Sequence, residues 1–277
     1  MATPVFPCLW FDGQAKAAAE LYCSLFKNSK IISETPVVVT FELNEKKIMA
    51  INGGPMFEIT PSISLFVYCE TIEETNRIWE ALYNGNAFIP MGSYPWSERY
   101  GWLRDKYGMT WQISVTDKKD ANLRILPSML FVSENFGKAG EAIRFYSEIF
   151  EMASTGFLVN YPENDPNAGK VMYSEFSLNG AEIIAMDGPG EHAYNFTEGV
   201  SLVILCEDQQ DIDHYWAKLT EGGEESMCGW LKDKFGVSWQ VVPKILEHLM
   251  SDPEKASKVF ESFRNMRKLE IDTLYKG

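Results

Sequence analysis

The stretch GWLRDKYGMTWQI at residues 101–113 recurs at residues 229–241 as GWLKDKFGVSWQV. Eight of the thirteen positions are identical, and the other five exchange similar side chains. Two tryptophans and two glycines at fixed spacing make coincidence a poor explanation. A recurrence of this kind indicates a duplicated structural unit. The sequence therefore predicts two copies of one domain.

The correspondence continues upstream of this motif. The matching positions are Ser64-Leu65 with Ser201-Leu202, Cys69-Glu70 with Cys206-Glu207, Phe41 with Phe176, Tyr22 with Tyr146, and Trp79 with Trp216. A chain of 277 residues is long enough for two domains with a core each. We expect a first domain at residues 1–116, a polar linker at 117–126, a second domain at 127–243 and a C-terminal extension at 244–277. The first copy carries extra residues around 88–100.

Each copy alternates short apolar strands with amphipathic helices. Asp12 is placed to cap a helix with apolar positions from Ala15 to Phe26, and residues 71–74 (TIEE) form a capping box for a second helix. The expected strands of the first copy are residues 9–11, 37–43, 47–51, 63–69 and 110–115. This gives β-α-β-β-β twice per copy. The predicted fold is α+β with four such modules.

The residues after the repeat predict one more helix. Asp252-Pro253 supplies a cap and a first-turn proline, and apolar residues recur at helical spacing from Ala256 to Met266. We expect the apolar face of this helix to pack on the second copy or on a partner subunit.

Composition and charge narrow the classes of partner. The net charge is −14, from 25 Lys+Arg against 39 Asp+Glu, which disfavours nucleic acid and anionic membranes and favours a small apolar or cationic ligand. No window approaches 18 apolar residues and the N-terminus has no basic region, so we expect a cytoplasmic protein without a membrane span. Five cysteines without a C-x-x-C motif predict free thiols in a reducing compartment.

The motifs resemble the PhnB-like branch of the vicinal-oxygen-chelate superfamily, which includes glyoxalases, bleomycin-resistance proteins and dioxygenases. The resemblance rests on CLWFDGQA at 8–15, FELN at 41–44, NGGP at 52–55 and the repeated motif, and it covers nearly the whole chain. It implies a vicinal-oxygen-chelate fold in which the two copies pair as a covalent pseudo-dimer. A further homodimer is compatible with it. The partner that it implies is a small molecule, and the label common in this branch is 3-demethylubiquinone 3-methyltransferase.

The resemblance also implies where a divalent ion would bind. The family's metal ligands fall near Pro7, Ser64 and Gln112 in the first copy, and near Pro127, Ser201 and Gln240 in the second. Proline cannot ligate through its side chain, and an amide ligates without charge. We therefore expect no metal. Dinucleotide and phosphate-binding motifs are also absent from the sequence, so we expect no cofactor.

The sequence gives little support for methyl transfer or for catalysis by a nucleophilic thiol. Residues 186–190 (MDGPG) resemble the glycine-rich turn of an S-adenosylmethionine site, but EHAY follows instead of a helix, so the sequence argues against methyl transfer. Cys228 stands where the first copy has Tyr100, and Lys232 is the one cation close to it in sequence. A thiol needs a lowered pKa to be nucleophilic, so an unreactive cysteine is the simpler interpretation.

A ligand pocket is the strongest functional prediction. Aromatic side chains on or near strands could line a cavity, and a few polar groups could orient a ligand there. Any single tryptophan is more often a core residue. The predicted ligand-binding residues are Trp10, Asn52, Trp96, Trp102, Trp111, Gln112, Asp187, Trp230, Trp239 and Gln240. The extra residues 93–98 in the first copy could form a lid over one pocket.

Three functions remain open from the sequence. The first is metal-free binding of a small hydrophobic or aromatic molecule. The second is a lyase, isomerase or dioxygenase of the superfamily with an atypical site, and a tightly bound metal would favour it. The third is an interaction protein with vestigial pockets, and the absence of ligand-sized cavities would favour that. The fold does not choose between them.

Overall fold

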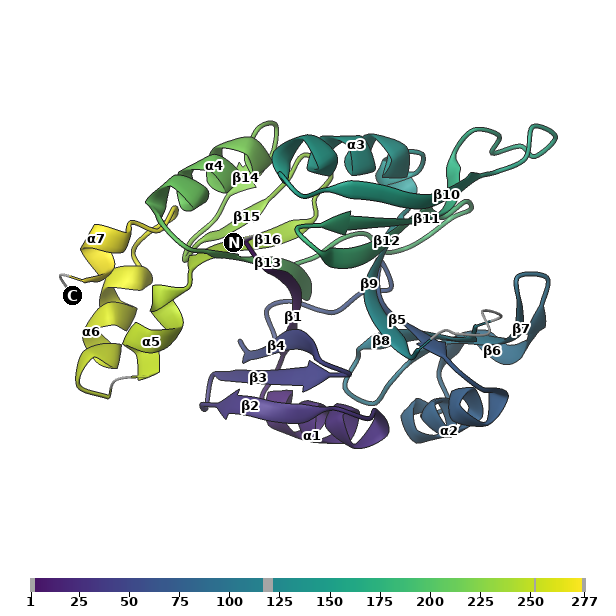
Figure 1. The fold of residues 1–277 in the computed structure, drawn as a ribbon, viewed down its shortest axis with the longest axis horizontal. Helices are drawn as coiled ribbons and strands as arrows, with labels where there is room; N and C mark the ends of the chain where they lie inside the picture. Colours follow the sequence, from purple (N-terminus) through teal and green to yellow (C-terminus); the bar gives the residue numbers. More distant parts are fainter. Residues whose placement is uncertain (1–2, 117–121, 252, 276–277) are drawn as a thin grey trace.

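The computed structural model describes residues 3–116, 122–251 and 253–275 (Figure 1). Four βαβββ modules follow one another along this part of the chain. The first comprises β1 (Val5–Phe11), α1 (Ala15–Leu25), β2 (Lys30–Glu34), β3 (Val38–Leu43) and β4 (Lys46–Asn52). The second comprises β5 (Ile63–Cys69), α2 (Ile72–Leu82), β6 (Ala87–Tyr94), β7 (Ser97–Arg104) and β8 (Thr110–Val115). The α+β fold predicted from the sequence is therefore confirmed.

The second copy repeats this order with shorter edge strands at its end. The third module comprises β9 (Arg124–Phe131), a 3-10 turn (Ser133–Asn135), α3 (Ala139–Ile149), β10 (Ser154–Asn160), β11 (Val171–Leu178) and β12 (Ala181–Asp187). The fourth comprises β13 (Val200–Cys206), α4 (Gln209–Leu219), β14 (Glu224–Glu225), β15 (Trp230–Lys232) and β16 (Ser238–Pro243). The helices α5 (Ile245–Ser251), α6 (Pro253–Phe263) and α7 (Ile271–Leu274) follow.

Each eight-stranded sheet combines one module from each copy (Figure 1). Sheet A joins the first and fourth modules in the order β14-β15-β16-β13-β1-β4-β3-β2, and sheet B joins the second and third in the order β10-β11-β12-β9-β5-β8-β7-β6. At the two joints, β1 pairs antiparallel with β13, placing Cys8 opposite Ser201, and β5 pairs with β9, placing Ser64 opposite Ser128. The copies at residues 1–116 and 127–243 are thus repeats in sequence that exchange modules in space.

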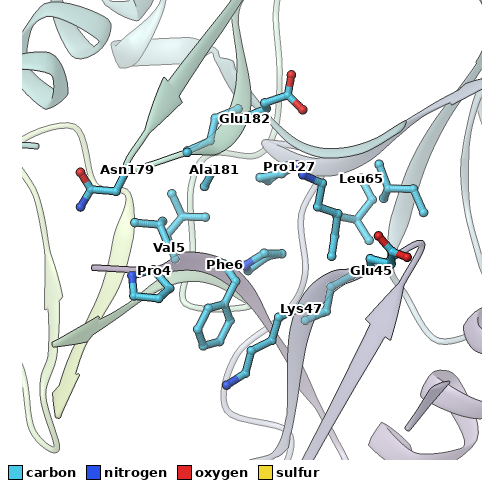
Figure 2. A pocket seen from close by; sticks show the side chains of 17 residues that line it. Pro4, Val5, Phe6, Glu45, Lys47, Leu65, Pro127, Asn179, Ala181 and Glu182 are labelled. Atoms are coloured by element: carbon cyan, nitrogen blue, oxygen red, sulfur yellow. The ribbon is translucent and has the colours of Figure 1, made fainter. Parts of the chain in front are cut away.

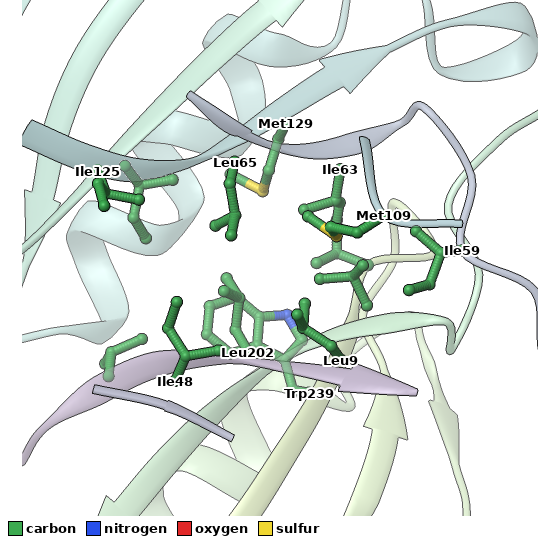
Figure 3. Packing of buried hydrophobic residues seen from close by; sticks show 14 of the residues in the cluster. Leu9, Ile48, Ile59, Ile63, Leu65, Met109, Ile125, Met129, Leu202 and Trp239 are labelled. Carbon is green, nitrogen blue, oxygen red and sulfur yellow. The ribbon is translucent and has the colours of Figure 1, made fainter. Parts of the chain in front are cut away.

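The two sheets share one apolar core. Leu9 and Leu202 of sheet A face Leu65 and Met129 of sheet B, and all four are at most 1% exposed (Figure 3). Successive side chains of a strand point to opposite faces, so one set of alternating residues in each central strand enters this core. The other set lies on the face that points away from the partner sheet. That second face, which we call the outer face, is where a site could form.

The repeated motif also ties the two sheets together. In the second copy, Asp233 accepts hydrogen bonds from the Tyr146 hydroxyl (2.6 Å), the Trp239 indole (2.9 Å) and the backbone N–H groups of Phe235 (2.9 Å) and Val237 (3.1 Å). In the first copy, Asp105 holds the equivalent positions with Tyr22 and Trp111. In each copy the tyrosine comes from a helix of one sheet and the aspartate from a turn of the other. These buried aspartates explain why the motif recurs.

The carboxyl group of Asp233 makes stability depend on pH. Its burial raises its pKa from 3.8 to about 6, against hydrogen bonds from Tyr146, Trp239 and the backbone that lower it. The folded protein then holds this proton more tightly than the unfolded chain. The resulting stabilisation is complete below the ordinary pKa of 3.8 and is lost as pH rises through about 6.

We therefore expect the free energy of unfolding of the native protein to fall between about pH 4 and pH 7 relative to that of Asp233→Asn, which cannot titrate. Chemical denaturation of both proteins across this range measures the difference. Parallel pH curves would show that this carboxyl group does not titrate in the folded state.

Several element boundaries differ from the sequence prediction. The predicted cap by Asp12 is wrong: α1 begins after Gln14, which makes no side-chain cap, and the side chain of Asn52 accepts a hydrogen bond from the Ala15 N–H instead (2.9 Å). The capping box at α2 is confirmed, because the Thr71 hydroxyl accepts from the Glu74 N–H. β9 begins at Arg124, inside the predicted linker, and residues 117–121 of that linker lie outside the described residues.

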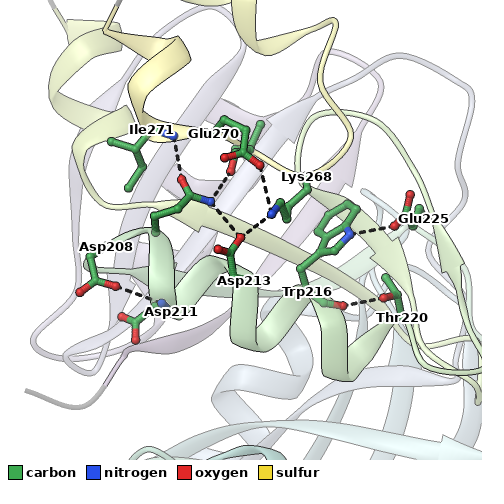
Figure 4. Close-up of polar contacts among 11 residues, drawn as sticks. Asp208, Asp211, Asp213, Trp216, Thr220, Glu225, Lys268, Glu270 and Ile271 are labelled. Atoms are coloured by element: carbon green, nitrogen blue, oxygen red, sulfur yellow. Dashed lines mark hydrogen bonds and ion pairs between the residues drawn. The ribbon is translucent and has the colours of Figure 1, made fainter.

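The C-terminal extension is more than one helix. α6 ends at Phe263, short of the predicted end at Met266, and the predicted cap at Asp252 lies outside the described residues. The chain then runs along the residues that lead into β15, where the N–H groups of Cys228 and Gly229 donate to the carbonyls of Met266 (2.7 Å) and Arg267 (2.8 Å). The side chain of Gln209 at the start of α4 bonds the backbone of Leu269 and Ile271 (Figure 4). The segment after α6 therefore packs on the second copy. The apolar face of α6 itself packs on α5 and α7, where Val259 meets Leu249 and Leu274, so the prediction that this face covers the second copy is wrong.

Every helix in the described part of the chain falls short of the length and hydrophobicity that spanning a bilayer requires.

Candidate functional site

The outer face of sheet A carries its own apolar cluster. Phe6, Cys8, Val203 and Leu205 form a group separate from the shared core. In β1, Phe6 and Cys8 alternate with the core residue Leu9, as the pleat of a strand requires. The side chain of Trp10 follows on the same face as Cys8, two residues further along.

A short polar row crosses the centre of each outer face. In sheet A, the Gln240 amide donates to the Ser201 hydroxyl (2.9 Å), and the Cys8 thiol hydrogen-bonds with both side chains. Burial nevertheless raises the pKa of the Cys8 thiol to about 12. At neutral pH this thiol is protonated, so the row in sheet A is uncharged.

Sheet B has the equivalent row with one added partner. The Gln112 amide donates to the Ser64 hydroxyl (2.9 Å), and its carbonyl oxygen accepts from the Tyr100 hydroxyl (2.7 Å). Ser128 occupies the place of Cys8, and its hydroxyl has no hydrogen-bond partner among the described residues. The two rows are built alike, but each takes its residues from both copies.

The predicted metal positions need one correction. Pro7 and Pro127 were expected at the first-strand ligand position, but both face inward, where they line a cavity between the sheets (Figure 2). The residues beside Ser201 and Ser64 are instead Cys8 and Ser128. Both sets consist of neutral hydroxyl, thiol and amide groups. Divalent ions prefer carboxylates, imidazoles or thiolates, so these residues do not fit a bound metal.

The inward cavity between the sheets has a volume of about 250 Å³. Its walls are apolar, with Leu65 and Leu202 among them, and charged residues such as Glu45, Lys47 and Glu182 stand at its margin (Figure 2). It lies where the two copies meet and offers a ligand few polar partners.

A larger cavity, of about 430 Å³, opens beside Trp10 and Trp230. We call it the Trp10–Trp230 pocket. The two indole rings meet edge to face with centroids 5.9 Å apart, and the ring of Phe57 lies edge-on to Trp10 at 4.9 Å. Trp230 pairs with Gln240 in the β-ladder, so the polar row of sheet A lies next to the pocket. Its lining residues are Trp10, Met56, Phe57, Glu198, Glu224, Glu225, Ser226, Met227, Cys228, Trp230, Leu231, Lys232 and Ser238.

Local backbone features hold this pocket in shape. The Trp10 indole donates to the Gly54 carbonyl (2.7 Å), which fixes the ring over the loop after β4. Cys228 has a positive φ of 63° and is bonded through its backbone to the C-terminal extension. Burial raises the pKa of the Cys228 thiol, which agrees with the unreactive cysteine predicted from the sequence.

Gly53 leaves the room that Trp10 occupies. A Cβ atom added at this position would lie 1.9 Å from the Trp10 ring, closer than any side chain permits. We expect Gly53→Ala to displace the indole and to lower the free energy of unfolding by about 1–3 kcal/mol. Thermal unfolding measures this.

Gly140→Ala in α3 is the matched control, because its added Cβ would meet Val171 at an ordinary 3.4 Å. Equal melting temperatures for the two variants would contradict the assigned packing of Trp10.

The outer face of sheet B is more aromatic than that of sheet A. Trp102 packs on Phe88 (5.1 Å), and its indole N–H has no hydrogen-bond partner among the described residues. Trp96 sits at the turn between β6 and β7, 64% exposed, and stacks on Tyr94 (5.0 Å) with its edge toward Tyr100 (5.7 Å). The extra residues of the first copy therefore lengthen the edge strands β6 and β7, and the rings of Tyr94 and Trp96 pack on Tyr100 of this face.

The ten predicted ligand-binding residues separate into three groups. The structure brings Trp10, Trp230 and Gln240 together on sheet A, and Trp96, Trp102 and Gln112 together on sheet B. The remaining residues, Trp111, Trp239, Asn52 and Asp187, face away from both sites.

These four residues have structural partners. Trp111 and Trp239 are fully buried between sheet and helices, where each donates to a buried aspartate. Asn52 caps α1, and Asp187 accepts from the N–H groups of Gly137, Ala139 and Val171. Strand alternation explains the tryptophans, because Trp111 and Gln112 are neighbours and must point to opposite faces.

Sequence reasoning also missed residues of the site. Cys8 could have been found from alternation, because it shares a face with Trp10, and Ser201, which the sequence indicated only as a metal position, lies opposite Cys8. Phe57, Glu198 and Ser238 come from loops and strand ends far apart in the sequence. No local pattern signals that these three residues meet.

Comparisons with known proteins place the chain in a family. A sequence model described as 3-demethylubiquinone-9 3-methyltransferase matches residues 3–114 and 123–242. A comparison with curated proteins found no match. The PhnB protein from Bacillus cereus is 37% identical, with 40% of this chain and 98% of that chain covered and a TM-score of 0.38.

Glyoxalase I from Zea mays is similar over the tandem arrangement. It is 10% identical, with 90% of this chain and 97% of that chain covered and a TM-score of 0.55. This likeness concerns the fold. The chain has the tandem vicinal-oxygen-chelate fold of glyoxalase I and belongs to the PhnB-like family, whose sequence model is described as 3-demethylubiquinone-9 3-methyltransferase.

Proposed function

We propose that this protein binds a small hydrophobic or aromatic molecule, without a metal, in the Trp10–Trp230 pocket. The cavity itself carries the proposal. Its volume of about 430 Å³ lies in the range of small-molecule sites, and two indoles and a phenyl ring form its walls. Aromatic faces of this kind supply apolar area and edge-to-face contacts for another ring.

The polar row of sheet A, which lies beside the pocket, is uncharged and favours binding over catalysis. The Cys8 thiol is protonated, and its partners Ser201 and Gln240 are neutral. Such groups orient a ligand by hydrogen bonds but provide neither an ionised nucleophile nor a base with a matched pKa.

The methyltransferase description finds no support in the loop after β12. Asp187 ends that strand, and its carboxylate accepts hydrogen bonds from three backbone N–H groups. The next helix, α4, begins only at Gln209, after β13. A glycine-rich turn that leads directly into a helix N-terminus, as nucleotide sites use, is therefore not formed by these residues.

The binding test uses N-phenyl-1-naphthylamine, a neutral probe that becomes fluorescent in apolar sites. We expect Trp10→Leu to weaken its affinity about tenfold, since a central aromatic contact is lost. Leucine is the residue at the equivalent position of the second copy, Leu130, so this variant should fold. Dialysis against a chelator should leave the affinity unchanged.

Trp96→Leu is the matched control on sheet B, and it should bind the probe as the native protein does. Loss of binding in Trp96→Leu but not in Trp10→Leu would move the site to sheet B. Loss of affinity after chelation, with a metal released in stoichiometric amount, would favour an enzyme with an atypical site.

A further inference from the structure

The Trp10–Trp230 pocket has an acidic margin. Three carboxylates, those of Glu198, Glu224 and Glu225, belong to its lining. Lys232 is the one cationic side chain in that lining, all of which lies within the described residues. The charge around the pocket is therefore negative before any pairing is considered.

The pairing of these groups leaves one carboxylate unneutralised. Lys232 forms an ion pair with Glu198 at 2.9 Å. Glu225 accepts from the Trp216 indole at 3.0 Å and lies 3.6 Å from Arg267 (Figure 4). The side chain of Glu224 makes no hydrogen bond or ion pair with the described residues. Glu224 stands opposite Lys232 in the β14–β15 ladder, but the ammonium group of Lys232 bonds Glu198, so a ligand entering beside Trp230 meets a carboxylate without an ion pair.

A second, independent observation points to a ligand. Ser238 belongs to the pocket lining and is 1% exposed, and its buried hydroxyl has no hydrogen-bond partner among the described residues. At the equivalent position of the first copy, the Thr110 hydroxyl donates to the Ile63 carbonyl (3.2 Å). A hydroxyl at this position of the fold can therefore find a partner within the protein, as Thr110 does on sheet B. The hydroxyl of Ser238 on sheet A does not. Buried polar groups normally find a partner, so a polar atom of the ligand is expected there.

We infer that the pocket selects aromatic amines in their cationic form, an inference that rests on the binding function proposed above. The ring of the ligand lies against Trp10 and Trp230, and its ammonium group faces Glu224. The Ser238 hydroxyl, which can both donate and accept, hydrogen-bonds the polar end. A cation near indole rings gains a further attraction from their negative faces. The net charge of −14 adds a field that draws cations toward the protein.

Three probes that share the indole ring system but differ in charge test this inference. Tryptamine carries a cation, tryptophol is neutral and indole-3-acetate is an anion. We expect tryptamine to bind about tenfold more tightly than tryptophol, and indole-3-acetate most weakly. Isothermal titration at low salt gives the three affinities. The preference should shrink in 0.5 M NaCl, because salt screens exposed carboxylates.

Two variants connect the preference to named residues. Glu224→Gln should lower the affinity for tryptamine several-fold and leave that for tryptophol unchanged. Glu221→Gln removes the same charge from an exposed position outside the pocket lining and is the matched control. Ser238→Ala should lower the affinity for both tryptamine and tryptophol.

The outcomes separate this inference from the proposed function. If N-phenyl-1-naphthylamine binds and depends on Trp10, but the three indole probes bind equally well or not at all, the binding function stands and the charge preference is wrong. If Glu224→Gln and Glu221→Gln lower tryptamine affinity equally, the selectivity comes from overall charge, and the role of Glu224 is overturned. If neither the naphthylamine nor any indole probe binds, both proposals fail.

Discussion

Replacing Asp233 with alanine is expected to lower the free energy of unfolding by about 4 kcal/mol or more. Four buried donors lose their acceptor at once: the Tyr146 hydroxyl, the Trp239 indole and two backbone N–H groups. Each unsatisfied buried donor costs about 1–3 kcal/mol, and the losses need not add fully. The tyrosine belongs to α3 of sheet B and the aspartate to the β15–β16 turn of sheet A, so the contact between the sheets weakens too.

Asp105→Ala should have a similar effect, since Asp105 makes the same four bonds in the first copy. Asp213→Ala is the control, because it removes an exposed carboxylate from a surface ion pair with Lys268, where about 1 kcal/mol or less is expected. Denaturant midpoints, with the slope of each transition, measure all three variants. A midpoint for Asp233→Ala no lower than that of Asp213→Ala would contradict the role given to this carboxylate.

Cutting the chain between its copies is expected to leave the protein assembled. Both sheets take strands from both copies, and the two halves share the β1–β13 and β5–β9 ladders and one continuous core. A protease site can replace residues 117–121. After cleavage, size exclusion under native conditions should show one species near 31.5 kDa that contains both fragments. In denaturant the fragments should separate.

A different elution profile would contradict the prediction that the cleaved halves stay assembled. If the cleaved protein elutes under native conditions as two species of roughly half the mass, each with native-like secondary structure, then each copy folds by itself. The exchange of modules between copies would then be wrong. Uncleaved protein with the same replacement at residues 117–121 controls for any effect of the new sequence.

Much of the fold follows from local sequence patterns. The repeated motif made the duplication predictable, because it combines a turn, a buried aspartate and two tryptophans at constant spacing. The strands with clear apolar runs, such as β5 and β13, were predictable for the same reason. β2 was not among the predicted strands, since all of its residues except Ile31 are exposed and no alternation of polarity marks it.

The partnership of the modules was not predictable from local patterns. β5 and β13 are equally apolar, so nothing in either sequence shows that β1 pairs with β13 and β9 with β5. This choice depends on the packing of whole modules. The C-terminal extension is a related case, because its path beside β15 is fixed by backbone hydrogen bonds at Cys228 and Gly229 that carry no sequence signature.

The site was predictable only in part. Trp10 and Trp230 were recognised as aromatic residues near strands, and they do meet. Trp111 and Trp239 were assigned to the same cavity, although the adjacent glutamines point to the outer faces and the tryptophans must then point inward. The acidic margin and Ser238 depend on loops from distant parts of the chain, which a single sequence does not place together.

The most direct test of the central claim is a crystal structure of the protein with N-phenyl-1-naphthylamine bound. The account predicts that the naphthyl ring lies against the indoles of Trp10 and Trp230, beside the Ser238 hydroxyl. Probe found instead between the sheets near Leu65 and Leu202, or over Tyr100 on sheet B, would contradict the claim that the Trp10–Trp230 pocket is the binding site.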